Sequence, residues 1–364
     1  MQIESTTDDL PGIFAWVVLG LILLGVLFSV IQAFLSSMVL GLFIYYCSRP
    51  IHKRMKKVVP YETISAVLTI FTFFTPFILI FYYTFSTALN EFQRAIFEYE
   101  IYELQPYINP YINFELLQVL ETPEVLFEQT EGVDLLTGLL DYFIVLAGVI
   151  GDVLLIVIVS LTVAYYLLKD DDKIRQWLET QSEPVTKDFT EFANLTDEDL
   201  SSIYFGNILN AIFTATIGIL VFVSFTTIAP KEMSLVFPVL LGILAGISSL
   251  VPMVGTKPVY FPVTVYLFAT IWFQNLPNEL YIYPLSFFII SAIIVDFIPD
   301  MLLRPYVSGR NIHIGILLIA YLSGPVLIGW YGFFLFPIFA VLFQHYYTLI
   351  FPKILRGISE HFTT

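Results

Sequence analysis

Three charged side chains, Lys257, Asp296 and Asp300, occur in or beside apolar stretches in the second half of the chain. Charge at membrane depth is costly, so such residues are candidates for function. Asp296, Asp300 and Arg304 are spaced four residues apart and share one face if a helix continues through Pro299. A carboxylate pair can bind a cation or carry a proton, and Arg304 would keep one carboxylate ionised. The alternative is capping of a helix end at the membrane surface.

Two further charged positions each have two interpretations. Lys257 can meet a carboxylate or a substrate anion, or extend along the apolar surface to water. Asp152, in the stretch GVIGDVLL, is deep in the membrane if its span starts near residue 143, and lies at the outer rim if the span starts at Val153. His313 and His345 have no metal-ligand spacing around them. We therefore expect no metal site and no cofactor.

The stretch GISSLVPMVGTKPVYFP, residues 246–262, interrupts an apolar region with three prolines and two glycines. Proline removes a backbone donor and disfavours helix at the preceding residue. Broken helices at membrane depth persist only where they are buried in protein or line a wet cavity. The stretch predicts helix, break, helix, as a re-entrant hairpin or a discontinuous span, and the alternative is a kinked but ordinary helix pair. The candidates from this stretch for lining a wet cavity, as a transport pathway or a binding site for a solute or ion, are Ser249, Pro252, Gly255 and Lys257.

A second stretch, residues 315–337, resembles the first, residues 242–262. In each, Gly-Ile-Leu precedes a proline, Pro252 or Pro325, with ten residues from the glycine to the proline. Paired apolar segments interrupted by Gly and Pro are the sequence signal of a transporter site at a repeat interface. The corresponding candidates in the second stretch are Ser323, Gly324 and Pro325. The match is short enough to arise by chance, so the repeat is a hypothesis.

The elements that must position these residues are membrane helices. Of 364 residues, 57% are hydrophobic and 13% are charged, and the mean hydropathy is +0.82, whereas a soluble domain carries about a quarter charged residues. The composition predicts an all-α polytopic integral membrane protein with about eight transmembrane helices, some of them broken or re-entrant in the C-terminal half. Apolar runs fall at 13–30, 31–47, 64–85, 143–168, 207–229, 235–251, 258–273, 281–298, 312–329 and 331–351.

Loop charge predicts the orientation. Residues 49–57 hold five Lys or Arg, which favours the cytoplasm, and residues 90–135 hold one basic and ten acidic residues, which favours the outside. The first two runs abut at Ser29 and Gln32 and predict a tight hairpin, so both termini are expected to be cytoplasmic in the plasma membrane. Four regions follow: 1–88, an N-terminal hairpin, basic loop and third span; 89–138, an extracellular acidic amphipathic segment; 139–206, a fourth span and cytoplasmic amphipathic segment; and 207–364, a transmembrane core with interrupted helices.

The formal net charge of −15 argues against a nucleic-acid partner, because binding phosphates requires Lys and Arg. An acidic surface is typical of proteins adapted to dense salt, which screens its self-repulsion. A halophile host is therefore a hypothesis, and a source proteome of ordinary pI would contradict it. The single cysteine, Cys47, excludes an intrachain disulfide and a thiolate metal cluster.

Two late motifs carry a resemblance to a known family. The sequences Leu250-Val-Pro-Met-Val-Gly255 and Asp300-Met-Leu-Leu-Arg-Pro305 resemble the Leu-Ile-Pro-Tyr-Ile-Gly-Pro and Asp-Asn-x-Leu-x-Pro motifs of the autoinducer-2 exporter (AI-2E) family of transporters. The resemblance covers most of the chain. It implies export of a small polar solute or sodium- or lithium-proton antiport, and assembly as a homo-oligomer. The departures are Thr256 for Pro, Met301 for Asn, Ser249 for Asn and Ile314 for Pro.

These observations favour a membrane transporter whose partners are the lipid bilayer and a small polar solute or Na⁺, Li⁺ and H⁺. A non-transporting scaffold acting through the acidic loop is one alternative. The other is an intramembrane protease, for which the glycine spacing before Asp152 is wrong and serine and zinc motifs do not occur. We expect the protein not to be an enzyme.

Overall fold

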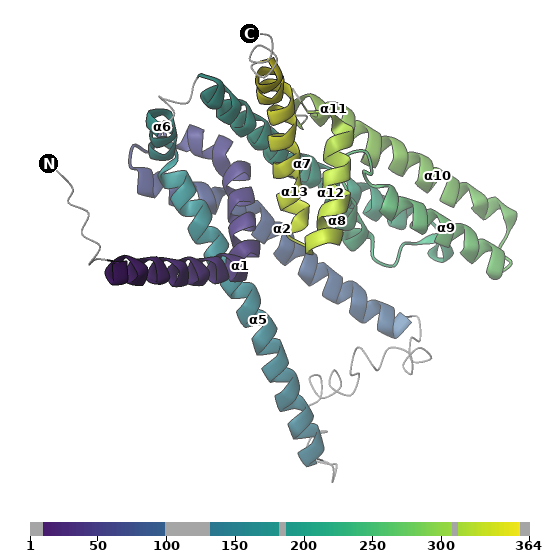
Figure 1. Ribbon diagram of the computed structural model, residues 1–364. Helices are drawn as coiled ribbons and strands as arrows, with labels where there is room; N and C mark the ends of the chain where they lie inside the picture. The colour runs from purple at the N-terminus through teal and green to yellow at the C-terminus, as the bar shows by residue number, and fades with distance from the viewer. Residues whose placement is uncertain (1–9, 99–131, 182–186, 308–311, 357–364) are drawn as a thin grey trace.

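A computed structural model describes residues 10–98, 132–181, 187–307 and 312–356, and every regular element in these ranges is helical (Figure 1). Six helical segments are long and apolar enough to cross a membrane. Two shorter apolar stretches of helix span Glu62–Pro76 and Ile314–Ile328. The fold is therefore that of an all-α polytopic membrane protein, as predicted. The six long segments are Phe14–Met55, Ala147–Lys169, Asp188–Ile228, Lys231–Ser248, Asn278–Leu302 and Gly332–Arg356.

The predicted tight hairpin at Ser29 and Gln32 is wrong. One continuous helix, α1 (Leu10–Met55), runs through both residues. The polar side chain that suggested a turn is satisfied inside the helix, because the Ser29 hydroxyl donates to the Gly25 carbonyl at 2.9 Å. The helix is about 69 Å long at 1.5 Å per residue, more than twice the hydrocarbon thickness. Figure 1 shows it bent, so that its N-terminal part leaves the rest of the molecule in a different direction.

The second half of α1 packs against α5 (Gly132–Lys169) through a small residue. A Cβ at Gly41 would lie 2.7 Å from the Ser160 carbonyl oxygen, so the two backbones approach closely there. The same half of α1 contributes Ile44 and the fully buried Cys47 to the main core cluster, with Tyr204 and Tyr321 from later helices. The N-terminal half of α1 stays almost entirely exposed.

Three helices extend beyond their predicted apolar runs. Helix α2 (Glu62–Glu98) and α5 both reach into the region 89–138, of which residues 99–131 lie outside the described ranges. Helix α7 (Lys187–Ile228) joins the predicted cytoplasmic segment and the following span in one 42-residue helix. A short helix, α6 (Asp171–Gln181), lies between α5 and α7 in the sequence.

Helix α8 (Pro238–Ser248) runs back along α7 in close contact. A Cβ on Gly242 would lie 2.5 Å from the Ile219 backbone nitrogen, and one on Gly246 would lie 2.6 Å from the Ala211 carbonyl oxygen. The contacts of α8 move toward the start of α7 as α8 advances, so the two helices are antiparallel. Small residues four apart permit this approach, as in other membrane helix pairs.

The chain then breaks over residues 249–256 and reverses into α9 (Lys257–Phe273). The predicted helix, break, helix is confirmed. Tyr260 of α9 packs on Phe288, and Phe268 packs on Tyr281, so α9 is antiparallel to α10 (Ile282–Ile290). Since α10 in turn packs antiparallel to α7, the pair α8–α9 forms a hairpin and not one discontinuous span.

A π-helical segment, Ser291–Phe297, joins α10 to α11 (Ile298–Val307). The helix therefore continues through Pro299. The proline ring would clash with the carbonyl four residues earlier, and the wider turn just before it relieves that clash. A second π-helical segment, Tyr346–Ile350, similarly ends two residues before Pro352. It follows the last hairpin, α12 (Ile314–Ile328) and α13 (Gly332–His345), whose break at residues 329–331 contains Gly329 with φ of +83°.

The basic segments predicted to share one side of the membrane gather at one end of the molecule. Lys56 after α1 pairs with Asp172 of α6 at 2.8 Å, and Lys353 near the C-terminus pairs with Asp188 of α7 at 2.6 Å. The hydrogen bond from Lys56 lowers the pKa of the Asp172 carboxyl below its usual range. Deeper in the same end, Arg49 of α1 pairs with Asp171 at 3.1 Å and with Asp197 of α7.

Candidate functional site

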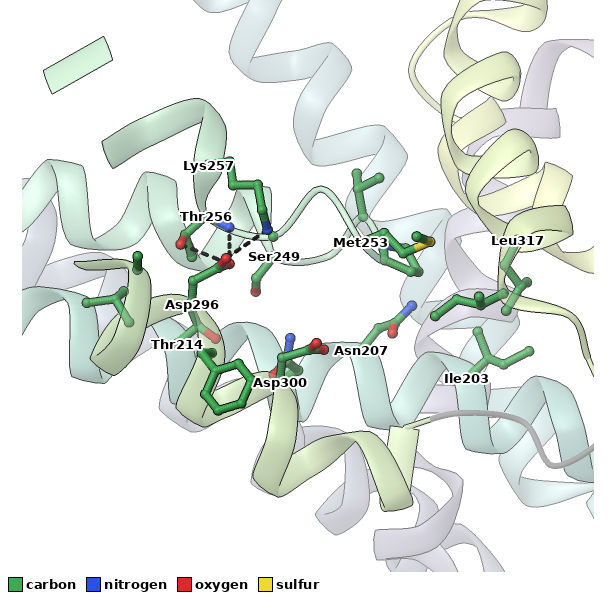
Figure 2. A pocket seen from close by; sticks show the side chains of 18 of the residues that line it. Ile203, Asn207, Thr214, Ser249, Met253, Thr256, Lys257, Asp296, Asp300 and Leu317 are labelled. Atoms are coloured by element: carbon green, nitrogen blue, oxygen red, sulfur yellow. Dashed lines mark hydrogen bonds and ion pairs between the residues drawn. The ribbon is translucent and has the colours of Figure 1, made fainter. Parts of the chain in front are cut away.

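A cavity of about 300 Å³ opens where the α8–α9 break meets α7, the π-helical segment and α12. It contains most of the residues predicted for the pathway: Ser249, Pro252, Gly255, Lys257, Asp296 and Asp300. In Figure 2, Lys257, Ser249 and Met253 lie on one side of the open space, and Asp300 and Asn207 lie on the other. Sequence positions 207, 249, 296 and 317 thus meet around one volume.

Asp296 is the most heavily bonded residue of the site. Its Oδ1 accepts from the Thr256 backbone N–H at 2.9 Å and from the Thr256 hydroxyl at 3.1 Å, and its Oδ2 lies 2.7 Å from Lys257 Nζ. Thr256 and Lys257 are the N-cap and first residue of α9, so the carboxylate sits at the positive end of that helix. The side chain of Asp296 is only 16% exposed. Asp296 therefore fastens the π-helical segment to the start of α9.

The break itself is a tight turn with its own hydrogen bonds. The Ser248 hydroxyl donates to the Gly255 carbonyl at 2.6 Å, and the Ser249 hydroxyl donates to the Gly246 carbonyl at 2.7 Å. Met253 and Gly255 both have positive φ, 67° and 60°. At Gly255 a Cβ would also collide with Asp296 Oδ1, so glycine is required there both by the backbone and by the carboxylate.

Helix α7 supplies a polar wall that the sequence analysis missed. Asn207, Asn210 and Thr214 line the cavity from one helix face, at positions i, i+3 and i+7. The Asn207 amide donates to the Tyr321 hydroxyl of α12 at 2.7 Å, which fixes its orientation. The signal was present in the sequence, since three polar residues recur at helical spacing within an otherwise apolar run.

The predicted series Asp296, Asp300 and Arg304 is partly brought together. Asp296 and Asp300 both line the cavity. Asp296 lies in the π-helical segment, and Asp300 follows Pro299 in α11. Asp300 is exposed and, in Figure 2, its carboxylate points toward Asn207. Arg304 belongs to α11, and its side chain lies outside the described residues.

Four predicted candidates do not line the cavity. Gly324 packs directly against Gly332 in the α12–α13 hairpin, and its neighbours Ser323 and Pro325 lie in the same continuous helix. The residues of α12 that do line the cavity are Ile314 and Leu317. Asp152 is exposed on α5, a helix that contributes no residue to the cavity.

Among the described residues, the charged groups that line the cavity are two carboxylates and one ammonium. Asp296 is balanced by Lys257, and Asp300 adds a second carboxylate beside the amides of Asn207 and Asn210. Carboxylate and amide oxygens are ligands for small hard cations, and the backbone at the break adds carbonyls. This arrangement supplies ligands for a cation or a small polar solute.

A family model described as "AI-2E family transporter" matches residues 13–351, nearly the whole chain. The chain belongs to the AI-2E transporter family. Similar AI-2E relatives, each named "Putative transport protein", come from archaea. The Methanothermobacter thermautotrophicus protein is 26% identical over 322 residues, 86% of each chain, and the Archaeoglobus fulgidus protein is 23% identical over 353 residues, 90% of this chain and 92% of the relative. The protein is thus a multi-pass membrane transporter of this family.

Two departures from the AI-2E motifs acquire a physical meaning. Thr256 stands where the family resemblance implies proline, and both its N–H and its hydroxyl donate to Asp296, which a proline could not do. Met301 stands in place of the motif's asparagine, and its side chain is 63% exposed and does not line the cavity. Among the residues that the structure describes, the amides that line the cavity belong to α7.

Proposed function

We propose that this protein is a secondary transporter that moves a small polar solute or cation through the cavity at the α8–α9 break, with Na⁺ or Li⁺ exchanged for H⁺ as the leading reaction. The observation that carries the proposal is the convergence of Asp296, Lys257 and Asp300 on a cavity built at a helix break in apolar surroundings. Polar groups so placed are costly in a membrane protein unless they serve transport.

Asp296 and Asp300 have different roles in the proposed exchange. Lys257 and the start of α9 hold the Asp296 carboxylate in place, through the ion pair at 2.7 Å and the hydrogen bond from the Thr256 backbone N–H. Asp300, beside Asn207 and Asn210, would hold the cation or, alternately, the proton. Because a protonated carboxyl attracts a cation weakly, occupancy by one would exclude the other, which is the requirement for exchange.

Several attributes belong to the same proposal. The clustering of basic segments at one end supports a cytoplasmic location for that end and for the C-terminus in the plasma membrane. The cytoplasmic N-terminus was inferred from a hairpin that does not form, so it now depends on how the two parts of bent α1 lie in the bilayer. A homo-oligomer, a salt-adapted host and the absence of catalytic chemistry remain predictions.

A scaffold role through the acidic segment 89–138 makes the opposite prediction for the cavity. If the protein only holds partners, neutral substitutions in the cavity leave its activity in the cell unchanged. If it transports, they abolish flux while the fold persists. Loss of folding is separable from loss of flux, because the only thiol, Cys47, is fully buried and reacts with a maleimide dye on unfolding.

The first experiment is cation–proton exchange in proteoliposomes. Purified protein is reconstituted with a trapped pH-sensitive dye, and sodium or lithium pulses are applied to wild type, Asp300→Asn and Asp152→Asn. We expect wild type and Asp152→Asn to exchange equally, and Asp300→Asn to lose exchange, since only Asp300 lines the cavity. The unfolding midpoint reported by Cys47 should be similar in all three.

Two outcomes would contradict the proposal in different ways. Exchange in Asp300→Asn at the wild-type rate would remove the late carboxylate from the mechanism. Absence of exchange in correctly folded wild type would exclude cation antiport and leave a small organic solute as the transported species.

A further inference from the structure

A second cavity, of about 330 Å³, lies away from the pathway at the basic end of the molecule. It opens between α1, α6 and α7, with Leu342 of α13 as a further wall. Most of its lining is apolar, and four aromatic rings contribute: Tyr45, Tyr46, Phe189 and Phe192. A concave, mainly apolar site with a few convergent polar groups is the usual form of a small-molecule site. None of its residues lines the cavity at the α8–α9 break.

The charged groups in this second cavity compensate one another. Of the described residues that line it, two are positive, Arg49 and Arg175, and two are negative, Asp171 and Asp197. Arg49 pairs with both carboxylates, and Arg175 lies 3.7 Å from Asp197. A charged ligand would place an excess charge beside Arg49, Asp171 and Asp197, whose side chains are largely buried, and this is costly. The balance therefore selects a neutral molecule.

The polar atoms near the cavity can still bond an oxygen atom. Arg175 is half exposed, and its contacts to Asn194 and Asp197 both use one terminal nitrogen, so donors remain among its five N–H groups. Thr196, 7% exposed, also lines the cavity, and its hydroxyl is buried with no hydrogen-bond partner in the described part of the chain. A ligand oxygen that reaches this hydroxyl would give it a hydrogen-bond partner.

We propose that the cavity between α1, α6 and α7 binds a small neutral amphiphile with an apolar body and one hydroxyl or carbonyl oxygen. The apolar body lies among the aromatic rings, and the oxygen faces Arg175 and Thr196. The ligand touches the three elements that Arg49, Asp171 and Asp197 connect, so its occupancy stiffens that junction. The site is independent of the transported species and does not rest on the transport proposal.

The test is photolabelling of the full-length protein in proteoliposomes with a diazirine derivative of octan-1-ol, followed by peptide mapping. We expect insertion to concentrate in peptides that contain residues 42–49 and 189–197. Unlabelled octan-1-ol should compete, whereas octanoate and octylammonium, which have the same chain length, should not. The Ala193→Phe variant fills the cavity and should reduce insertion there to background.

The matched control is Ala147→Phe, on the exposed surface of α5, which should label like wild type. Ala193→Leu is the smaller substitution to use if Ala193→Phe lowers the unfolding midpoint reported by Cys47. Insertion spread over the exposed helices with no enrichment at these peptides would overturn the site. Equal competition by octanoate or octylammonium would overturn its preference for neutral ligands. Labelling by a diazirine-bearing lipid chain that octan-1-ol does not displace would assign the cavity to the bilayer instead.

Discussion

Asp296 is a single residue that makes three structural interactions. It caps the start of α9, it neutralises Lys257, and it requires the glycine at position 255. A bound ion or solute that contacts this carboxylate therefore acts on the π-helical segment and on the α8–α9 break at once. The residue couples the chemistry of the cavity to the helices that form it.

The Thr256 hydroxyl provides a graded test of that coupling. Thr256→Val keeps the backbone N–H and the side-chain shape but removes the hydroxyl donor at 3.1 Å from Asp296. We expect a loss of about 1 kcal/mol in stability, the usual contribution of such a bond. Thr216→Val is the control, because the Thr216 hydroxyl is exposed and bonds only its own helix at Ile212. Unfolding midpoints measured through Cys47 would decide, and equal midpoints for the two variants would contradict this role.

At the residue scale, the sequence identified the charged residues that line the cavity but not the uncharged polar ones. Lys257, Asp296 and Asp300 were identified because charge in an apolar stretch is expensive and conspicuous. Asn207, Asn210 and Thr214 were missed because each is singly unremarkable, and only their shared helix face reveals them. Gly324 was assigned to the pathway, yet its small size serves close packing against Gly332, a use that sequence cannot distinguish from a break.

At the scale of elements, two antiparallel helix pairs, α7–α8 and α12–α13, are closely packed, and small residues allow the packing of each. Gly242 and Gly246 let α8 lie on α7, and Gly324 and Gly332 let α12 lie on α13. Without a hydrophobic driving force between helices in lipid, such close packing is a main source of association. The cavity depends on it, because α8 delivers the break to the polar face of α7.

Gly242→Ala should disturb that packing. The added Cβ would meet the Ile219 backbone nitrogen and Cα at 2.5 and 2.7 Å, and backbone cannot move as a side chain can. We expect destabilisation of roughly 1–3 kcal/mol, typical of overpacking. Gly148→Ala, with nothing within 4 Å of the added atom, is the control and should be neutral or slightly stabilising. A midpoint for Gly242→Ala at or above the control would contradict the close approach.

Helix breaks were predictable where proline and glycine coincide, and the break at 249–256 fell where they do. Helix continuity was harder to predict. The join at Ser29 and Gln32 looked like a turn, but it contains neither glycine nor proline, and the helix satisfies its serine hydroxyl internally. The π-helical segment at Ser291–Phe297 arises from the proline that follows it, a cause that hydropathy does not register.

At the scale of the molecule, the end that gathers the basic segments is a junction of three helices. Arg49, 4% exposed, connects α1 to Asp171 of α6 and to Asp197 of α7, and Tyr45 donates to Asp171 at 2.6 Å. These residues are up to 148 positions apart in the sequence. The two halves of the chain are therefore joined by a buried charge network at this end.

Arg49→Met should break that junction. It leaves Asp171 without its paired cation and Asp197 with only Arg175, at 3.7 Å, and removing one partner of a buried pair typically costs about 3–5 kcal/mol. The triple variant Arg49→Met, Asp171→Asn, Asp197→Asn removes the uncompensated charges and should recover much of the loss. Unfolding midpoints through Cys47 measure both. A single variant as stable as wild type would show that the network does not hold the halves together.

The wide turn at Ser291–Phe297 also sets a rotational phase. Each residue of an α-helix turns the chain by about 100°, so the direction in which Asp300 points depends on how many residues precede it in that segment. Deleting Phe297, which lies between Asp296 and Asp300, would turn Asp300 by about 100° relative to Asp296 and out of register with Asn207. The length of the π-helical segment therefore determines whether the two carboxylates line the same cavity, and Pro299 favours that length because its ring does not fit the tighter α-helical turn.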